Sequence, residues 1–283
     1  MKKILVTGGA GFVGTNLIKK LLSKGHQVIS IDNYVTGKHE NELKGCTYFN
    51  IDINDKNITD KLNIKEIDHI FHLAALARIQ PSLVNPNETI EVNVKGTLNI
   101  LLLAKKYNIS LTYAGSSSCH DGLYGSPYAW SKHAGEQLCK LFSEVYDLNT
   151  SICRFYNVYG PHQLEEGDYS TVIGIFERQY RNNQPLTITG TGEQRRDFTH
   201  VDDIVGGLYK CMDKEFKAEI FELGRGKNFS INEIVDMFGA ERKYIPARKG
   251  EYPTTLCTDD KAQKILEWKA VKNLNSYIKN VIK

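Results

Sequence analysis

The sequence predicts an α/β fold: a doubly wound parallel Rossmann sheet with a smaller C-terminal lobe. In the first half of the 283-residue chain, short apolar runs typical of strands alternate with longer amphipathic segments typical of helices. A glycine-rich segment, residues 8–14, joins the first such run to the first such helix. Strands that alternate with helices pair in parallel, and the helices then cover both faces of the sheet.

The pattern of each segment in the first half predicts its element. Residues 12–23 form an amphipathic helix that closes at Gly25, and residues 88–106 form a long helix with an apolar stripe. A third helix, residues 129–146, has one polar and one apolar face. The expected strands are residues 3–7, 27–31, 48–51, 69–73, 111–114 and 150–155.

The second half is organised differently. After Pro161 the runs are shorter, and proline and glycine interrupt them at residues 184–185, 190–192 and 246–250. We therefore expect a main domain at residues 1–156 and a smaller lobe over most of residues 157–283. A strand at 220–223 and a helix starting near Asp202 are expected to return to the main sheet.

The composition argues against several classes of protein. Hydrophobic residues make up 41% and charged residues 24% of the chain, as in ordinary folded proteins. The formal charge is only +3 and no run of basic residues occurs, so nucleic acid is not an expected partner. No apolar stretch is long enough to span a membrane. The six cysteines are scattered without a C-x-x-C pair, which indicates reduced thiols in the cytoplasm and predicts neither a disulfide nor a metal site.

The glycine-rich segment indicates a dinucleotide site in the main domain. Glycines allow a tight turn there and bring a pyrophosphate close to the start of the following helix. Asp32 ends the second expected strand, where a carboxylate accepts hydrogen bonds from the ribose of NAD and repels the 2′-phosphate of NADP. We therefore predict NAD as the cofactor, bound by Gly8, Gly11, Phe12, Val13 and Asp32.

The end of the third expected strand supplies a weaker signal. Asp52 and Ile53 follow this strand and are predicted to contact the adenine. An aspartate in that position also commonly caps a helix, and both interpretations stay open.

Tyr128 and Lys132 stand four residues apart on the third helix, and hence on one face. An ammonium group lowers the pKa of a neighbouring phenol and makes it a usable acid and base. The spacing alone is weak evidence, because Tyr34 and Lys38 share it. Support comes from three serines, residues 116–118, which follow an expected strand and so lie where ligands bind in this architecture. The alternative is that these serines only form a turn or cap a helix.

Together these motifs resemble the extended short-chain dehydrogenase/reductase family, and within it the nucleotide-sugar 4-epimerases. The resemblance covers nearly the whole chain. The segments that carry it in the first half are residues 7–14, 32–33, 71–75, 93–97, 116–118 and 128–132, and downstream they are residues 154–161, 196–203 and 248–251.

The resemblance implies an NAD-dependent epimerase that acts at carbon 4 of a UDP-hexose or UDP-N-acetylhexosamine through a transient 4-keto sugar. Tyr128 would take the proton of the 4-hydroxyl, and Ser116, with Ser117 beside it, would hydrogen-bond the same oxygen. Lys132 would keep the tyrosine ionised and bind the nicotinamide ribose. A homodimer through helices 88–106 and 129–146 is also implied.

The same resemblance implies further contacts. For the substrate, Asn157, Arg196 and Arg248 would meet the diphosphate and Glu251 the ribose. The remaining NAD contacts that it implies are Asn33, Leu73, Ala74, Ala75, Asn93, Tyr128, Lys132 and Phe155.

Two features separate the chain from parts of this family. Similar dehydratases carry an Asp-Glu pair, and similar decarboxylases a Glu, just after the catalytic hydroxyl, whereas Ser117 and Ser118 stand here. The loop before Tyr128 is shorter than usual. The alternatives are an epimerase/reductase that uses Cys119 and His120 as acid and base, a dehydratase, or a catalytically silent NAD-binding protein.

Overall fold

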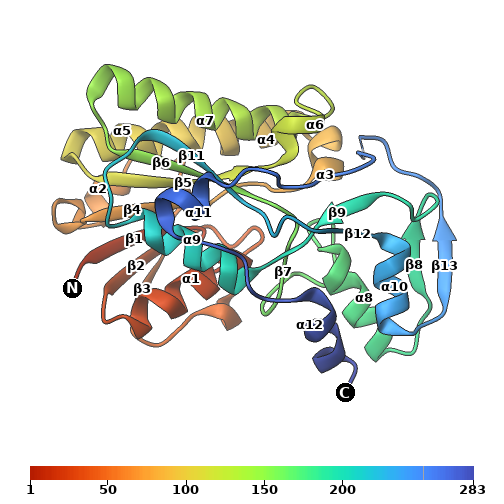
Figure 1. Ribbon diagram of the computed structural model, residues 1–283. Helices are drawn as coiled ribbons and strands as arrows, with labels where there is room; N and C mark the ends of the chain where they lie inside the picture. The colour runs from red at the N-terminus through yellow and green to blue at the C-terminus, as the bar shows by residue number, and fades with distance from the viewer. Residues whose placement is uncertain (251) are drawn as a thin grey trace.

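Among residues 1–250 and 252–283, which the computed structural model describes, seven strands form one parallel sheet (Figure 1). Its order is β11-β6-β5-β4-β1-β2-β3, so the direction of winding reverses between β1 and β4. Ligands of such sheets bind beyond the carboxyl ends of the strands, at this reversal. The strands are β1 (Lys3–Thr7), β2 (Gln27–Asp32), β3 (Cys46–Asn50), β4 (His69–His72), β5 (Ser110–Ser116), β6 (Thr150–Phe155) and β11 (Lys217–Leu223).

The predicted α/β fold is confirmed, and all six strands expected in the first half are present. β5 is longer than expected and continues to Ser116, which pairs in register with Phe155 of β6. Both residues therefore lie at the carboxyl edge of the sheet, where the winding predicts a ligand.

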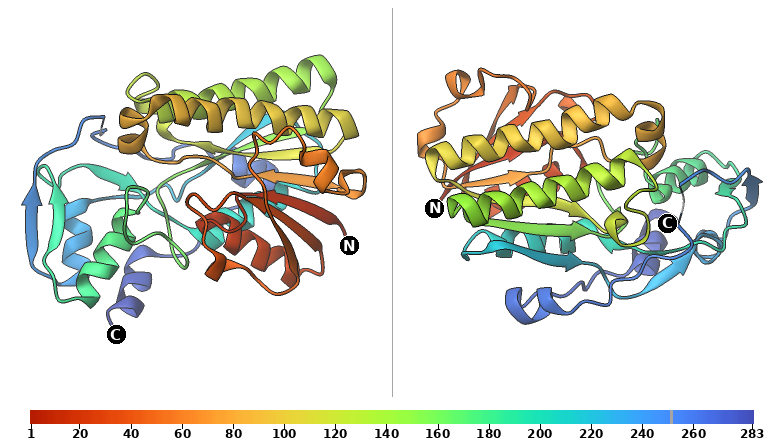
Figure 2. Two further views of the ribbon diagram at one scale, coloured as in Figure 1. Left: turned by 180° about the vertical axis from the view of Figure 1, so that it is seen from behind. Right: turned by 90° about the horizontal axis from the view of Figure 1, so that it is seen from above.

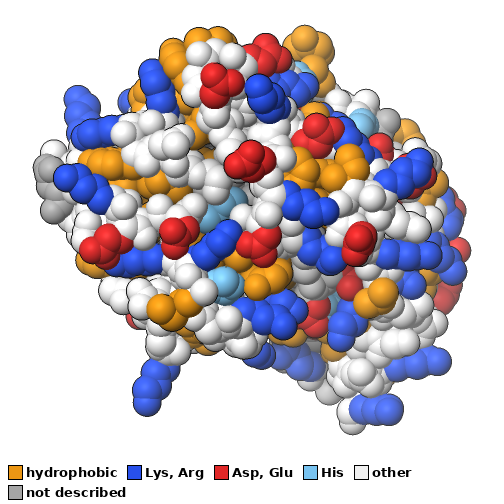
Figure 3. Space-filling view, turned by 60° about the vertical axis from the view of Figure 1, so that its left-hand side comes forward, with side chains coloured by type: hydrophobic (Ala, Val, Ile, Leu, Met, Phe, Trp, Pro, Cys, Tyr) orange, Lys and Arg blue, Asp and Glu red, His pale blue; other side chains and the backbone are white. Residues whose placement is uncertain are grey.

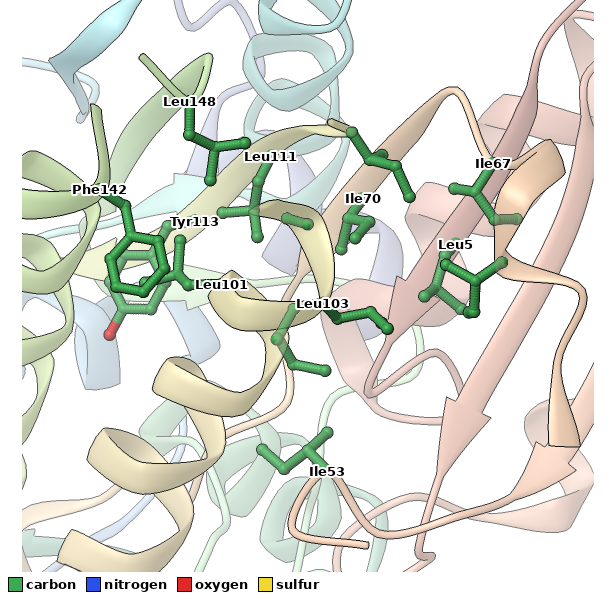
Figure 4. Close-up of a cluster of buried hydrophobic side chains, with 14 of the residues drawn as sticks. Leu5, Ile53, Ile67, Ile70, Leu101, Leu103, Leu111, Tyr113, Phe142 and Leu148 are labelled. Carbon is green, nitrogen blue, oxygen red and sulfur yellow. The ribbon is translucent and has the colours of Figure 1, made fainter. Parts of the chain in front are cut away.

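Helices cover both faces of the sheet. On one side lie α1 (Phe12–Ser23) and α9 (Val201–Cys211) with α11 (Lys261–Leu266), and on the other lie α5 (Thr97–Tyr107) and α7 (Pro127–Tyr146) (Figures 1 and 2). Leu5, Ile70 and Leu111 of the sheet pack against Leu101 of α5 and Phe142 of α7 (Figure 4). Complete burial of such a side chain contributes about 1.5–3 kcal/mol.

The helix expected at 88–106 is not one regular α-helix. It begins as α4 (Pro86–Ile90), passes through a π-helical turn, η3 (Glu91–Gly96), and continues as α5. Within the turn, the Asn93 side chain donates to the backbone carbonyl of Leu76 and accepts from its backbone N–H. These contacts with the loop after β4 replace regular helix geometry, and an apolar stripe cannot reveal them.

The second lobe has its own core. Phe176 of α8 and Phe238 of α10 meet edge to face, with ring centres 6.1 Å apart, beside the buried Ile188 of β8. Its elements are β7 (Val158–Tyr159), α8 (Val172–Arg181), β8 (Leu186–Thr189), β9 (Arg195–Asp197), β10 (Thr199–His200), β12 (Asn228–Ser230), α10 (Ile231–Phe238), β13 (Arg242–Ile245) and α12 (Leu274–Val281).

Short helices complete the chain, and two segments from the second half join the main sheet. As predicted, β11 adds a strand beside β6, and α9 packs against α1. We propose the boundary between residues 156 and 157, since β6 ends at Phe155 and β7 begins at Val158. The short helices are η1 (His39–Asn41), α2 (Ile58–Lys61), η2 (Ile64–Glu66), α3 (Ile79–Val84) and α6 (Ser118–Asp121).

The surface carries acidic and basic side chains side by side on the face shown in Figure 3. This mixture matches the small formal charge of +3. In the described part of the chain, no helix combines the length and the apolar character needed to cross a membrane.

Candidate active site

A cavity of about 1000 Å³ extends from the glycine-rich turn to the second lobe. Two of the predicted residues, Asn93 and Lys132, are not among the described residues that line it, and Glu251 lies outside the described residues. The predicted residues that do line it are Gly8, Gly11, Phe12, Val13, Asp32, Asn33, Asp52, Ile53, Leu73, Ala74, Ala75, Ser116, Ser117, Tyr128, Phe155, Asn157, Arg196 and Arg248.

The glycine-rich turn has the shape that a pyrophosphate requires. Gly8 has a φ of +72°, and a Cβ there would lie 2.9 Å from the backbone of Ala74. A Cβ at Gly14 would lie 2.1 Å from the carbonyl oxygen of Gly8. Gly11 caps α1 without a side-chain hydrogen bond, so the first N–H groups of the helix stay available for an anion.

Asp32, the last residue of β2, lies beside the glycine-rich turn. Its carboxylate accepts hydrogen bonds from the backbone N–H of Ala10, at 2.9 Å, and of Tyr34, at 2.8 Å. Burial raises the pKa of Asp32, and these two bonds oppose the rise. A carboxylate has about four acceptor sites, so it can also accept from ribose hydroxyls, whereas a 2′-phosphate would face a negative charge. The residues present therefore fit NAD.

Asn33 and Asp52 lie side by side near Asp32. The Asn33 side chain donates to the Asp52 carboxylate at 2.7 Å, and the other Asp52 oxygen accepts from the backbone N–H of Asn54 at 2.7 Å. Asp52 thus orders the turn that follows β3 while it lines the cavity. Its place on the cavity wall supports the predicted contact with adenine, and its bond to the Asn54 N–H supports the alternative of a local capping role.

Ser116 and Tyr128 meet on the cavity wall. The Tyr128 hydroxyl donates to Ser116 Oγ at 3.3 Å, and the Ser118 hydroxyl donates to the same oxygen at 2.9 Å. Ser116 is the last residue of β5, and Tyr128 lies in the first turn of α7. Ser126 caps that helix by accepting from the backbone N–H of Ala129, which fixes where the turn begins.

The side chain of Lys132, which is predicted to act on Tyr128, contacts the ring of Tyr113. Lys132 is buried, and its Nζ lies 4.4 Å from the centre of the Tyr113 ring. Burial lowers the pKa of Lys132 to about 8. Burial also raises the pKa of Tyr128, and the opposing influences are the Ser116 hydroxyl and the charge of Arg78. The four-residue spacing predicts a shared helix face, whereas the position of the lysine ammonium depends on tertiary contacts such as that with Tyr113.

Arg78 is a cavity residue that sequence reasoning missed. It precedes α3, and its guanidinium donates to the carbonyls of Ala77, at 3.0 Å, and Ser170, at 3.1 Å. Ser170 belongs to the second lobe, so this bond connects the two sides of the cavity. The signal in the sequence is a single charged residue inside the otherwise apolar run 73–79.

The end of the cavity at the second lobe is built from distant segments. The Asn157 side chain donates to Thr255 Oγ1 at 3.2 Å, and Thr255 Oγ1 also accepts from the backbone N–H of Asp197 at 3.3 Å. Arg196 donates to the carbonyl of Arg195 at 2.9 Å, and Arg248 is exposed at the rim. Of the three residues predicted to bind the diphosphate, Arg196 and Arg248 are cationic, and both line the cavity.

Comparison with known proteins identifies the family. Residues 4–224 match the NAD dependent epimerase/dehydratase family. The chain belongs to this family. It is 35% identical over 301 residues to a putative UDP-glucose 4-epimerase of Methanocaldococcus jannaschii, covering 99% of this chain and 97% of that protein.

Solved structures of family members superpose on this one. The UDP-glucose 4-epimerase of Thermotoga maritima with UDP-glucose has a TM-score of 0.92 and 28% identity, covering 99% of this chain and 97% of that one. The UDP-glucuronic acid 4-epimerase of Bacillus cereus, in complex with UDP-glucuronic acid and NAD, has a TM-score of 0.89 and 26% identity, covering 98% and 96%. The predicted family, the NAD cofactor and an epimerase-type enzyme are confirmed.

Cys119 and His120 do not line the cavity of this family member among its described residues. His120 Nε2 lies 2.9 Å from Glu222 Oε1, which also accepts from Arg154 at 2.8 Å. Burial raises the pKa of the Cys119 thiol to about 12, so the thiol stays protonated at neutral pH. This position argues against the acid and base roles considered for the two residues.

Proposed function

We propose that the chain interconverts epimers at carbon 4 of a nucleotide-diphosphate hexose, with UDP as the nucleotide. The observation that carries this proposal is the contact of the Tyr128 hydroxyl with Ser116 Oγ, at 3.3 Å, on the wall of the cavity that also contains the glycine-rich turn and Arg196. A phenol beside a serine hydroxyl suits proton transfer at a sugar hydroxyl. The relatives that act on UDP-sugars support UDP as the nucleotide.

The proton chemistry follows from these two side chains. Tyr128 accepts the proton of the 4-hydroxyl and returns it after the 4-keto sugar has presented its other face. Ser116, with Ser117 beside it, hydrogen-bonds the sugar oxygen in both steps and keeps it near the phenol. NAD, when bound, supplies the redox chemistry at carbon 4, and because this chemistry is reversed within one turnover, no external reductant is consumed.

The other predicted residues are assigned either to the cofactor or to the substrate. Lys132 lies over the Tyr113 ring, and we assign to it the stabilisation of the ionised Tyr128 phenol and the contact with the nicotinamide ribose. Asn93 acts indirectly, because its side chain is occupied by the backbone of Leu76 and by Ser131. We assign the remaining NAD contacts to Asn33, Asp52, Ile53, Leu73, Ala74, Ala75 and Phe155, and the substrate contacts to Asn157, Arg196, Arg248 and Glu251.

An epimerase is favoured over a dehydratase because of the two residues after Ser116. Elimination of water needs a carboxyl group beside the reacting carbons, and Ser117 and Ser118 stand in that part of the wall. The lining carboxylates Asp32 and Asp52 belong to the turn region, while Glu88 and Asp168 are exposed.

The test is direct. Purified protein is incubated with UDP-linked hexoses, N-acetylhexosamines and hexuronates, and the products are separated by chromatography and mass spectrometry. We expect interconversion of a C4 epimer pair without added reductant. Product lighter by one water would replace the epimerase by a dehydratase, and no conversion with NAD still bound would leave a silent NAD-binding protein.

We also propose a homodimer in the cytoplasm. The outer faces of α5 and α7 expose Leu102, Leu141 and Val145, which a second copy would cover. The six cysteines are all free, as expected of reduced thiols. Light scattering that finds only a 32.0 kDa species would reject the dimer.

A further inference from the structure

Arg78 is a half-buried cation on the wall of the cavity. Its guanidinium donates to two backbone carbonyls, those of Ala77 and Ser170. A guanidinium has about five N–H groups, so most of its donor capacity is left for a ligand. The two carbonyls also hold the planar group in a fixed orientation.

No carboxylate neutralises this charge among the residues that the structure describes. Arg78 forms no ion pair there, whereas Arg154, at a similar depth, bonds to both Glu136 and Glu222. Glu88 and Asp168 line the same cavity, but both are exposed and neither forms an ion pair with Arg78. A cation that is partly withdrawn from water is costly unless an anion accompanies it. Within the described part of the chain no carboxylate supplies that anion, and a ligand in the cavity can supply it.

The position of Arg78 indicates which part of the ligand carries the negative charge. Arg78 directly precedes α3, and Ser82 of that helix accepts a hydrogen bond from the backbone N–H of Tyr128 at 3.1 Å. Arg78 and Tyr128 thus line the cavity from two helices that contact each other, which places Arg78 on the same side as the proposed acid and base. The diphosphate has other cations at the second lobe, Arg196 and Arg248, which also line the cavity.

We propose that Arg78 binds a carboxylate on the sugar ring, and that the chain prefers nucleotide-linked uronic acids over the corresponding neutral hexoses. This inference rests on the proposed C4 epimerisation and specifies its substrate class. A carboxylate matches the fork of a guanidinium and accepts two parallel hydrogen bonds. A neutral hexose with a hydroxymethyl group in that place leaves the cation without its anion.

The experiment compares two substrates that differ only in this group. UDP-glucuronate and UDP-glucose are supplied to the wild-type enzyme, and kcat/KM for formation of each C4 epimer is measured. We expect a preference for the uronate of about 100-fold, the size that loss of a charged partner in a closed site produces. Arg78→Gln is expected to remove this preference by lowering kcat/KM for the uronate about 100-fold more than kcat/KM for the neutral sugar.

Two matched variants test whether the effect is specific. Arg248→Gln removes a cation assigned to the diphosphate, which both substrates share, so both rates are expected to fall by the same factor. Arg242→Gln removes an exposed arginine that pairs with Asp236 outside the cavity, and neither rate should change. Arg78→Lys keeps the charge without the fork, and we expect it to recover part of the uronate preference.

Each other result overturns the inference. A wild-type preference for the neutral sugar refutes the uronate preference, and an equal loss for both sugars in Arg78→Gln places Arg78 on a part common to both substrates. If Arg78→Gln does not fold, the wild-type preference and Arg78→Lys still decide. Turnover of UDP-glucose without turnover of UDP-glucuronate refutes the carboxylate site but keeps the epimerase, whereas no turnover of any UDP-sugar refutes the proposed function itself.

Discussion

Two half-buried arginines lie in different regions of the molecule and are neutralised in different ways. Arg154 lies in β6, where Glu136 of α7 accepts two of its hydrogen bonds, at 3.0 and 2.7 Å, and Glu222 of β11 accepts a third at 2.8 Å. Arg78 lies on the cavity wall and bonds only to backbone carbonyls among its described partners. The first charge is satisfied within the fold, and the second is left for a ligand.

This difference indicates that Arg154 stabilises the fold, whereas Arg78 is available to a ligand. Glu136 is completely buried and Glu222 nearly so, so both carboxylates depend on Arg154. His120 adds a bond to Glu222 and thereby ties the short loop after β5 to the sheet. Changes in this charged cluster (His120, Glu136, Arg154, Glu222) should alter folding, whereas changes on the cavity wall should alter turnover.

The largest expected effect is on the cavity side. Tyr128→Phe removes the group that exchanges a proton with the sugar, and we expect kcat to fall roughly 10³-fold, within the usual range for a general acid and base. The free energy of unfolding should change little, because only one hydroxyl and its bond to Ser116 are lost. Turnover assays and urea unfolding of the same preparations measure kcat and the free energy of unfolding. A retained kcat would remove Tyr128 from the mechanism.

The charged cluster should show the reverse behaviour. Arg154→Met leaves Glu136 buried without a cation, and we expect the free energy of unfolding to fall by about 3 kcal/mol. Arg242→Met, which breaks the exposed pair with Asp236, is the control and should cost less than about 1 kcal/mol. Equal losses in the two variants would show that burial of the Arg154 pairs contributes nothing.

Acid should weaken the charged cluster through protonation of Glu222. Burial opposes ionisation of Glu222, but the hydrogen bond from His120 and the charge of Arg154 lower its pKa below the ordinary 4.5. Because the folded-state pKa is the lower one, ionised Glu222 stabilises the fold above pH 4.5, and this contribution is lost as the pH falls through the folded-state value. Unfolding at a series of pH values should show a steeper acid loss for wild type than for Glu222→Gln, and parallel curves would contradict this assignment.

The smallest effect is expected for Cys119, which lies between the two regions. Its thiol is protonated at neutral pH because burial raises its pKa to about 12. Cys119→Ser should therefore change kcat by less than about 2-fold, as measured with the preferred UDP-sugar. A large loss would move Cys119 into the chemistry and revive the epimerase/reductase alternative.

Much of the fold was predictable because local patterns decide it. Residues 12–23 and 150–155 form the expected helix and strand with unchanged bounds, since periodic apolar residues and flanking glycines act within a few residues. The bend of the 88–106 helix into a π turn was not predictable, because its cause is contact with the loop after β4. The cofactor contact of Asn93 follows from the resemblance, whereas its hydrogen bonds to the Leu76 backbone appear only in the tertiary structure.

By itself the sequence determined the sheet, the glycine-rich turn and the order of the segments along the chain, because hydrophobic period and backbone freedom are local properties. Tertiary structure alone decided that Lys132 ends over Tyr113, that Arg154 bonds to two carboxylates, and that Arg78 bonds to none among residues 1–250 and 252–283. Whether a charge is neutralised depends on residues far apart in the chain that folding brings within a few ångströms of it. The distance from a guanidinium to the nearest carboxylate, and the exclusion of water around both, distinguish an arginine that stabilises the fold from one that can bind a ligand.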